Sequence, residues 1–432
     1  LRRQPSTPPI STRLIRRTSS DERILSSCAS RITISRSSNG ISERQAKMST
    51  FTFATVPQII AGPGCIARLS ELTKTRLGSR VMVISDEGVV KAGLVQPALA
   101  SLADGGVEVS VFTGVVADPP EAIIHAAVAQ AIGFGATGVL GIGGGSSLDV
   151  AKLVALLCKS GEALGDIYGV AKVRGQRLPL VLVPTTAGTG SEVTPISIVT
   201  TGAHEKKGVV SPVLLPDAAL LDAELTLGLP PAVTAATGID AMVHAIEAFT
   251  SASANNNPVS RALAKEALRL LGANIEIAVM KGTDLAARQA MLLGAMLAGQ
   301  AFANSPVAAV HALAYPIGGR YHVAHGLSNS LVLPHVLRFN AIACGDAYAE
   351  LAPCLFPDLE PAGQAERLAG FIEGLAILPV RLNLPVRLRD VGIPKDGLPL
   401  LAESAMKQIR LLVNNPRTVS LSDAARIYEV AW

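Results

Sequence analysis

The fold is decided by one stretch, Thr137-Gly-Val-Leu-Gly-Ile-Gly-Gly-Gly-Ser-Ser-Leu-Asp149. Its apolar start predicts a buried strand over 137–142, and the residues after the glycines predict a helix that ends near Leu157. Glycines between a strand and a helix let a phosphate approach the backbone, and the helix N-terminus offers free N–H groups. The spacing of Ser146 and Asp149 matches a helix cap. Taken alone, the pattern fits a simple strand-to-helix turn equally well.

The same alternation of strand and helix extends on both sides of this stretch. Short β-branched or apolar runs predict strands over 80–85, 107–112 and 178–183. Amphipathic segments between them predict helices over 89–103 and from Asp118-Pro119-Pro120 to Phe134, with Asp118 as the cap. Strands that alternate with helices indicate a parallel sheet covered on both faces. We therefore predict an α/β dinucleotide-binding domain over residues 48–225.

The second half of the chain has a different pattern: its apolar residues recur at helical spacing, and few runs are typical of strands. Helices are predicted near 232–251, 259–281, 285–304, 327–340, 361–375 and 422–430. Residues 226–432 are therefore predicted to form an all-helical domain that binds metal and substrate. The stretch 289–319 contains no charged residue, but polar residues interrupt it, so it fits a helix buried in protein better than a membrane span.

Composition indicates the kind of core and argues against one functional class. The chain has 432 residues, of which 49% are hydrophobic, 17% charged and only 3% aromatic. Large cores of small aliphatic residues suit buried parallel strands and close-packed helices. The scarcity of aromatic residues argues against nucleic-acid binding, which uses aromatic platforms among basic clusters. The five cysteines form no C-x-x-C pair and are predicted to be free thiols in a reducing compartment.

The first 47 residues differ from the rest of the chain. They are rich in serine and arginine and carry a net charge of +7, which leaves −3 of the total of +4 for the remainder. This composition is typical of an organellar transit peptide. The alternative, which we favour, is a non-native or disordered extension before Met48. We therefore expect a cytoplasmic protein, mitochondrial only if residues 1–47 are a real transit peptide.

Two other loops predict a cofactor for the glycine-rich turn. Asp86 ends the strand 80–85, where an acid can bond a ribose 2′-hydroxyl. The loop Thr185-Thr-Ala-Gly-Thr-Gly-Ser191 follows the strand 178–183 and offers hydroxyls and glycines. Loops at the carboxyl ends of parallel strands are where ligands bind in open sheets. We predict a dinucleotide, and NAD(H) rather than NADP(H), because Asp86 would repel a 2′-phosphate.

One carboxylate and three histidines predict a metal site. Asp240 and His244 are four residues apart, so they stack on one helix face, although such a pair is often only a surface hydrogen bond. His311 and His325 lie in an apolar stretch where unpaired imidazoles are costly to bury. We predict these four residues as ligands of a borderline divalent ion such as Fe²⁺, Zn²⁺ or Mn²⁺.

The remaining histidines of this region are interpreted differently, and the whole pattern suggests a reaction. His322 is a candidate for the substrate cleft, and His335 is interpreted as structural. A divalent ion can polarise a substrate oxygen while hydride moves between the substrate carbon and a nicotinamide ring. The sequence therefore predicts a metal-dependent oxidoreductase that acts on a small alcohol or aldehyde.

Four motifs together resemble the iron-containing, group III alcohol dehydrogenases: 143–149, 184–194, 238–247 and 311–326. The resemblance runs from about residue 50 to the C-terminus. It implies the α/β and all-helical pair of domains shared with dehydroquinate synthases, an active site in the cleft between them, Fe²⁺ as the first choice of metal, and a homodimer or larger homo-oligomer. It also places all four predicted ligands at the family's ligand positions.

The resemblance carries residues over to the cofactor site as well. With Asp149, which closes the glycine loop, the predicted cofactor-binding residues are Asp86, Asp118, Gly144, Gly145, Ser146, Thr185, Thr186 and Lys207. Asp118 is a mild departure, because some members have Asn there. Several members carry a proton-relay histidine four residues after the third ligand. Here Tyr315 stands in that place and is a poor base at neutral pH, so His322 is the alternative relay.

Other activities occur among enzymes of this kind. The alternatives are a maleylacetate reductase-like enzyme, which would lack the metal-ligand quartet, and a hydroxyacid–oxoacid transhydrogenase-like enzyme, which would suit a real transit peptide. A dehydroquinate synthase-type lyase is less favoured, because residues 226–330 hold few of the basic side chains that a sugar-phosphate pocket needs. A non-enzymatic assembly protein would not need the quartet.

Overall fold

A computed structural model describes residues 50–202 and 205–432, apart from the side chains of residues 72–75. The predicted leader at 1–47 lies outside the described residues. Within them, strands are confined to residues 59–221 and the α-helices of the C-terminal half begin at Pro231.

A six-stranded parallel sheet forms the framework of the first half. Its order is β1-β9-β6-β4-β2-β3, and every neighbouring pair runs parallel. The strands are β1 (Ile59–Ala61), β2 (Arg80–Asp86), β3 (Glu108–Val115), β4 (Gly138–Gly143), β6 (Leu180–Pro184) and β9 (Ala218–Leu221). The interior strands β4, β6 and β9 are buried at every residue, as expected for strands covered on both faces. The predicted fold class is confirmed.

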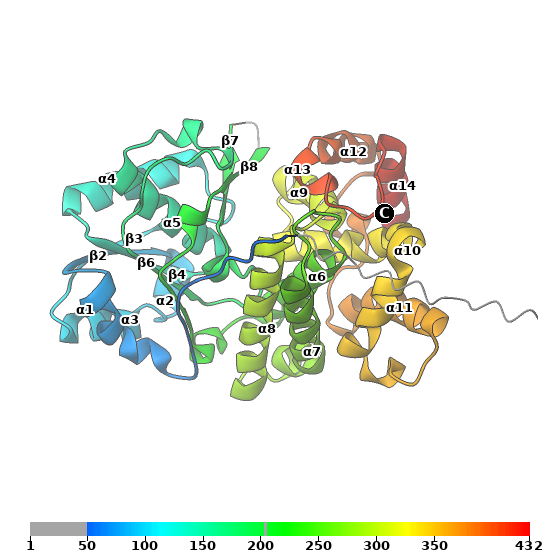
Figure 1. Ribbon diagram of the computed structural model, residues 1–432, viewed down its shortest axis with the longest axis horizontal. Helices are drawn as coiled ribbons and strands as arrows, with labels where there is room; N and C mark the ends of the chain where they lie inside the picture. The colour runs from blue at the N-terminus through cyan, green and yellow to red at the C-terminus, as the bar shows by residue number, and fades with distance from the viewer. Residues whose placement is uncertain (1–49, 203–204) are drawn as a thin grey trace, which may run out of the picture. The chain divides into compact units, whose positions relative to one another are not determined.

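Helices cover the two faces of this sheet (Figure 1). Met82 and Ile84 of β2 face a core shared with α4 (Glu121–Phe134) and α5 (Gly145–Ser160). Val81 and Val83 face the opposite core, shared with α1 (Leu69–Arg76) and α3 (Gln96–Asp104). This alternation follows from the two-residue period of a strand, which sends neighbouring side chains to opposite faces.

The strand order creates a switch point between β2 and β4. The chain leaves β2 to pair β3 on one side, then returns so that β4 pairs β2 on the other side. In open parallel sheets, ligands bind in the crevice at the carboxyl ends of the strands where the order reverses. Asp86 and Gly143 end these two strands, so the switch point lies between the acid and the glycine loop.

Two local expectations in this half are corrected, and one sheet is additional. The segment 89–103 forms two helices, α2 (Glu87–Lys91) and α3, interrupted where Gly93 takes a positive φ of 75°. Asp118 does not cap α4: Pro120 is the N-cap, and Asp118 itself has a φ of 51°. A second sheet, unpredicted, contains β5 (Gly169–Val170), β7 (Ile196–Thr201) and β8 (Glu205–Val210), with β7 and β8 antiparallel.

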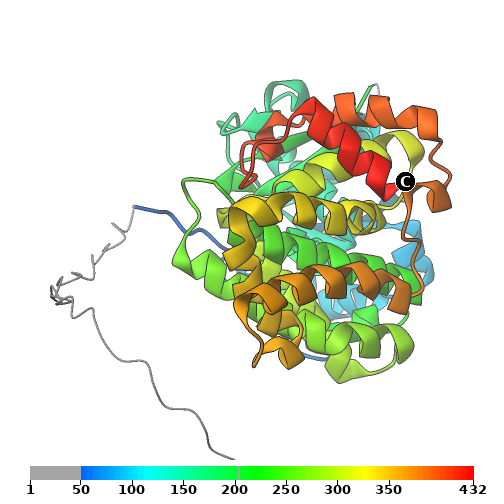
Figure 2. The same cartoon turned by 90° about the vertical axis from the view of Figure 1, so that its right-hand side faces the viewer.

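The C-terminal half is helical, and its later helices face the viewer in yellow to red in Figure 2. The α-helices are α6 (Pro231–Thr250), α7 (Pro258–Met280), α8 (Leu285–Asn304), α9 (Ala309–Tyr321), α10 (His325–Leu355), α11 (Gln364–Arg381), α12 (Leu398–Met406), α13 (Ile409–Leu412) and α14 (Leu421–Ala431). The uncharged stretch 289–319 is mostly α8 and α9, both largely buried in protein. Across residues 50–202 and 205–432, no helix is long and apolar enough to cross a membrane.

One backbone contact ties the helical half to the threonine loop. A Cβ added to Gly299 of α8 would lie 2.8 Å from the Cα of Gly190 and 2.8 Å from a methyl of Val193. Only glycine at both positions lets the loop pack this closely on the helix. The loop after β6 is therefore held directly against the helix whose next turn carries Phe302, a lining residue of the cavity described below.

Candidate metal and cofactor site

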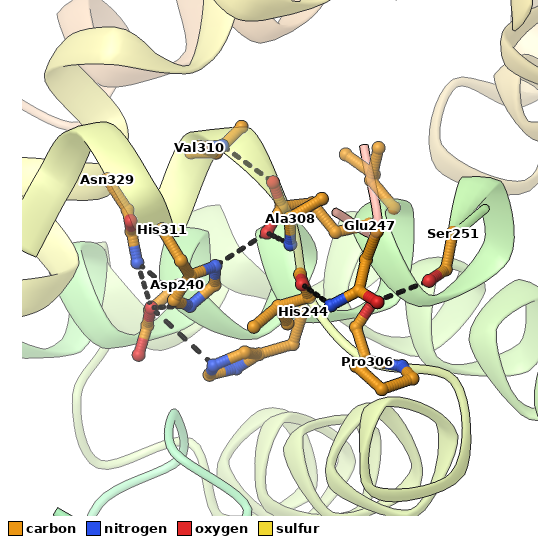
Figure 3. Close-up of polar contacts among 12 residues, drawn as sticks. Asp240, His244, Glu247, Ser251, Pro306, Ala308, Val310, His311 and Asn329 are labelled. Carbon is orange, nitrogen blue, oxygen red and sulfur yellow. Dashed lines mark hydrogen bonds and ion pairs between the residues drawn. The ribbon is translucent and has the colours of Figure 1, made fainter. Parts of the chain in front are cut away.

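Three helices bring the four predicted metal ligands together. Asp240 and His244 lie one turn apart on the buried face of α6, His311 is in the first turn of α9, and His325 is the first residue of α10. One ligand atom from each residue lies within 4.8 Å of all the others. Figure 3 shows Asp240, His244 and His311 turned toward one another.

The distances describe acceptor groups that converge on one point. The Nε2 atoms of His244, His311 and His325 lie 4.0, 3.8 and 3.6 Å from Oδ1 of Asp240. Asn329 adds a donor: its Nδ2 lies 2.6 Å from the same Oδ1, while its own Oδ1 is buried with no hydrogen-bond partner among the described residues. A carboxylate and three imidazole nitrogens around one centre are a donor set that fits a divalent cation.

The charge states of the cluster suit metal binding. Burial lowers the pKa of His244 to about 4 and that of His325 to about 3, so both rings are neutral at physiological pH. Burial alone would raise the pKa of Asp240, but the three neighbouring imidazoles hold it below its ordinary value. Metals bind neutral imidazole and ionised carboxylate, so Asp240, His244 and His325 are already in their ligating forms.

A cavity of about 500 Å³ lies at the switch point of the sheet. It is lined by Asp86, by the glycine loop over 144–147 and by residues 113–117, which form the end of β3 and the first two residues after it. Asp86 accepts hydrogen bonds from the backbone N–H of Val89 and from Oγ of Ser147. A Cβ on Gly145 would lie 2.8 Å from the methyl of Thr189, so a side chain there would close the loop. The open loop and the first turn of α5 fit the phosphates of a dinucleotide.

A second cavity, of about 220 Å³, joins the glycine loop to the metal cluster. It shares Gly145 and Ser146 with the first cavity and reaches all four predicted metal ligands. The other lining residues are Asp118, Pro119, Asp149, Thr189, Ser191, Thr194, Ile196, Ile198, Thr200, Lys206, Phe302, Val307, Tyr315 and Arg410. A cofactor on the glycine loop and an ion on the cluster would therefore meet in one continuous space.

The threonine loop lies beside the glycine loop. The backbone N–H of Thr185 donates to the carbonyl of Gly143 at 2.9 Å, at the ends of the paired strands β6 and β4. The side chain of Thr186 faces Gly144, where an added Cβ would lie 3.7 Å from it. Both threonines thus border the proposed phosphate site.

Asp149 has a different task from the predicted cap. Gly144 is the N-cap of α5 and makes no side-chain cap, while Ser146 lies inside the first turn. The Asp149 carboxylate accepts from Oγ of Ser191 at 2.6 Å and from the N–H of Ile198 at 2.9 Å. These bonds fix the cavity wall. Asp149 therefore joins α5 to the threonine loop and β7 and does not cap the helix.

Two other predicted residues, Lys207 and His322, do not line the cavity that reaches the metal cluster. Lys207 lies over the ring of Tyr168, and the neighbouring Lys206 lines the cavity instead, with its Nζ 2.7 Å from Oδ1 of Asp118. His322 is exposed at the C-cap of α9, with a φ of 55°, and is not among the lining residues. The structure therefore does not bring the alternative relay to the cleft.

Tyr315 does reach the cleft. Its ring contacts the rings of His311 and His325, with centroid distances of 6.5 and 5.7 Å. Burial raises the pKa of the phenol, so Tyr315 stays protonated at neutral pH and can donate a proton rather than accept one.

Sequence reasoning missed Glu247, Asn329, Lys206 and Arg410. Glu247 had a signal, because it follows His244 by three residues on the same helix face. Its Oε2 lies 2.7 Å from Nδ1 of His311, within hydrogen-bond distance (Figure 3). No sequence pattern indicated a role for Arg410, because it comes from α13, a helix too short to be predicted.

Comparison with known proteins agrees with this geometry. Residues 57–223 match the family model for iron-containing alcohol dehydrogenase, and residues 234–432 match the model for the C-terminal part of the Fe-containing alcohol dehydrogenase family. Long-chain-alcohol dehydrogenase 1 of Geobacillus thermodenitrificans is 39% identical over 389 residues, which cover 89% of this chain and 98% of that protein.

Solved structures share the whole architecture. A crystal structure of 1,3-propanediol oxidoreductase superposes with a TM-score of 0.85 at 32% identity, covering 89% of this chain and all of that one. Sulfoacetaldehyde reductase from Bifidobacterium kashiwanohense, solved in complex with NAD⁺, has a TM-score of 0.79 at 27% identity and covers 89% of this chain and 99% of that one. The predicted enzyme class, an oxidoreductase using NAD(H) with a divalent metal, iron first, is confirmed at the level of the family. The chain belongs to the iron-containing alcohol dehydrogenase family.

Proposed function

We propose that Asp240, His244, His311 and His325 hold the metal, and that the enzyme transfers hydride between NAD(H) and a small alcohol or aldehyde. The observation that carries this proposal is the convergence of four acceptor atoms within 4.8 Å, in a cavity continuous with the glycine loop. When bound, the ion supplies a Lewis acid and the nicotinamide supplies a hydride donor or acceptor. A maleylacetate reductase-like enzyme, which would lack the quartet, is less well supported.

The protein's own groups have distinct proposed tasks. Asp86 and the first turn of α5 orient the dinucleotide, with Asp149, Thr185 and Thr186 shaping the loop around it. Lys206, rather than Lys207, is the lysine placed to contact bound molecules, because its side chain turns into the cleft. Tyr315 Oη is the proposed proton donor to the substrate oxygen in the reducing direction, since burial keeps the phenol protonated.

The cavity wall suggests which substrates to screen. Ile198, Phe302 and Val307 offer an apolar surface for an aliphatic chain, whereas Lys206 and Arg410 place positive charge at the same cavity. Lys206 is paired with Asp118, and no salt bridge is found for Arg410 among the described residues. The screen should therefore compare neutral aldehydes with aldehydes of similar length that carry a carboxylate or sulfonate. Arg410→Gln should lower kcat/KM for the anionic set only, if Arg410 contacts that group.

The decisive experiment combines metal analysis with cofactor oxidation. Purified protein should contain close to one divalent ion per chain and oxidise NADH in the presence of short aldehydes. Chelator treatment followed by desalting should remove both the ion and the activity, and Fe²⁺ or Zn²⁺ should restore them. Activity that persists in fully metal-free protein would refute the metal-dependent mechanism.

Two broader properties are also proposed. We expect a homodimer or larger homo-oligomer in the cytoplasm, in keeping with the family resemblance and the free thiols expected in a reducing compartment. Sedimentation velocity would measure the first, and fractionation of cells that express the full chain would measure the second. A monomer in solution, or enrichment in mitochondria, would refute the corresponding proposal.

A further inference from the structure

Glu247 lies behind the metal cluster, on the ligand-bearing face of α6. It follows Asp240 by seven residues and His244 by three, which places all three side chains along one stripe of the helix. Glu247 is only 4% exposed. Burying a carboxylate is costly unless donors surround it, so its partners indicate what it does.

Each oxygen of Glu247 accepts from the start of α9 (Figure 3). Oε2 lies 2.7 Å from Nδ1 of His311 and accepts from the N–H of Ala308 at 3.0 Å. Oε1 accepts from the N–H of Val310 at 2.6 Å. Ala308 is the N-cap of α9 and has no side chain that can cap, so Glu247 supplies the anion that this helix end would otherwise lack.

The bond to His311 decides which ring nitrogen faces the metal centre. Both Glu247 oxygens already accept backbone N–H groups, so the carboxylate is the acceptor and Nδ1 of His311 carries the proton. The Nε2 lone pair is then free, and Nε2 is the atom that lies 3.8 Å from Oδ1 of Asp240. We propose that Glu247 is a positioning residue, which fixes the metal-ligating tautomer of His311 and holds α9 against α6 so that the ligands meet.

The test is the metal affinity of Glu247→Gln, measured without reference to activity. Glutamine keeps the size but replaces one accepting oxygen with a donating NH₂ group. That group must face either His311 or a backbone N–H, so the ring loses its acceptor or the start of α9 moves. Partners that orient a metal-binding histidine are typically worth about 10- to 100-fold in affinity. Competition of the apoprotein with a chromophoric chelator for Zn²⁺ should show a loss of this size.

Ser251→Ala is the matched control. Oγ of Ser251, the C-cap of α6, donates to the carbonyl of Pro306 at 2.7 Å and fixes the same α8–α9 connection without touching a ligand (Figure 3). It should lower the unfolding midpoint while Zn²⁺ affinity stays unchanged. Equal losses of affinity in Ser251→Ala and Glu247→Gln would overturn the specific role of Glu247.

A double-mutant cycle separates action through His311 from a general effect. In a His311→Ala background, Glu247→Gln should cause little further loss of Zn²⁺ affinity, because the group that it positions is gone. A full additional 10-fold loss would overturn the proposal. The measured quantity is the difference between the effects of Glu247→Gln on Zn²⁺ affinity with and without His311. A purely structural role would lower the affinity equally in both backgrounds.

A measurement on the unmutated apoprotein keeps the proposal testable if Glu247→Gln fails to fold. With ¹⁵N-labelled histidine, the ring signals of His311, assigned by their absence in His311→Ala, should report a proton on Nδ1. A proton on Nε2 would overturn the proposal. The inference rests on the proposed metal centre: wild-type protein that binds no Zn²⁺ would refute the centre, whereas wild-type binding with an unaffected variant refutes only the role of Glu247.

Discussion

The buried Lys152 provides a sharp test of how the cofactor half is held together. Its side chain is 0% exposed and lies behind the cavity wall in α5. Nζ donates to Oγ of Ser191 at 2.8 Å, to Oγ1 of Thr194 at 3.1 Å and to the carbonyl of Ile196 at 2.6 Å. The Asp149 carboxylate lies 3.4 Å away. Burial lowers the pKa of this amine, so the surrounding acceptors and the carboxylate must offset the cost of the charge.

The expected effect of Lys152→Met follows from those contacts. Methionine keeps the unbranched stem and removes the ammonium, which leaves the Asp149 carboxylate without its cation and three acceptors without their donor. Removing one member of a buried ion pair typically costs about 3–5 kcal/mol, and hydrogen bonds to charged groups contribute about 1.5–3 kcal/mol each. Relief from the desolvation of the ammonium offsets part of this loss. We expect a net loss of about 3 kcal/mol in the free energy of unfolding.

Urea unfolding at fixed protein concentration measures this loss from the midpoint and the slope. The exposed pair of Glu87 and Lys91, joined at 2.7 Å on α2, is the matched control, and Lys91→Met should leave the midpoint unchanged within error. A loss below about 1 kcal/mol for Lys152→Met, with an unchanged slope, would refute the reasoning. That result would mean that water or the neighbouring hydroxyls replace the ammonium without strain.

Three further changes have defined outcomes. Gly299→Ala should lower the free energy of unfolding by about 1–3 kcal/mol and raise the KM for NADH, because the new methyl would lie 2.8 Å from the Cα of Gly190. Wild-type values for both quantities would contradict the packing argument. His335 has a folded-state pKa of about 4, from burial, against 6.5 when unfolded, so stability is full above pH 6.5 and is lost as the pH falls toward 4. Replacing His335 with Gln should reduce the loss of unfolding free energy between pH 6.5 and pH 5 by about 1–2 kcal/mol, as measured by urea unfolding at both pH values. If the variant loses as much stability as the wild type over this range, His335 is not the source of the loss. Tyr315→Phe should lower kcat for aldehyde reduction by about 100-fold or more if the phenol is the proton donor, with unchanged Zn²⁺ affinity, whereas an unchanged rate and pH profile would exclude this role.

The sequence by itself predicted the architecture and the four residues proposed as metal ligands, which the structure brings together. Short apolar runs that alternate with amphipathic segments are typical of parallel strands covered on both faces, so the α/β half could be predicted from the pattern around Thr137–Asp149. Asp240 and His244 share a helix face whatever packs around them, because the geometry of the helix fixes their spacing. Glycine loops at the ends of parallel strands carry the same local information about a phosphate site.

Only the tertiary structure decided which neighbouring side chains complete the site. Lys206 and Lys207 are adjacent in one strand, and the pairing of β8 with β7 selects which of them turns into the cleft. The carboxylate of Glu247 finds a role only because α9 begins beside α6. Arg410 reaches the cavity from a short helix far along the chain. Such contacts depend on how elements pack across long sequence separations. The local periodicity that predicts a helix or strand does not determine that packing.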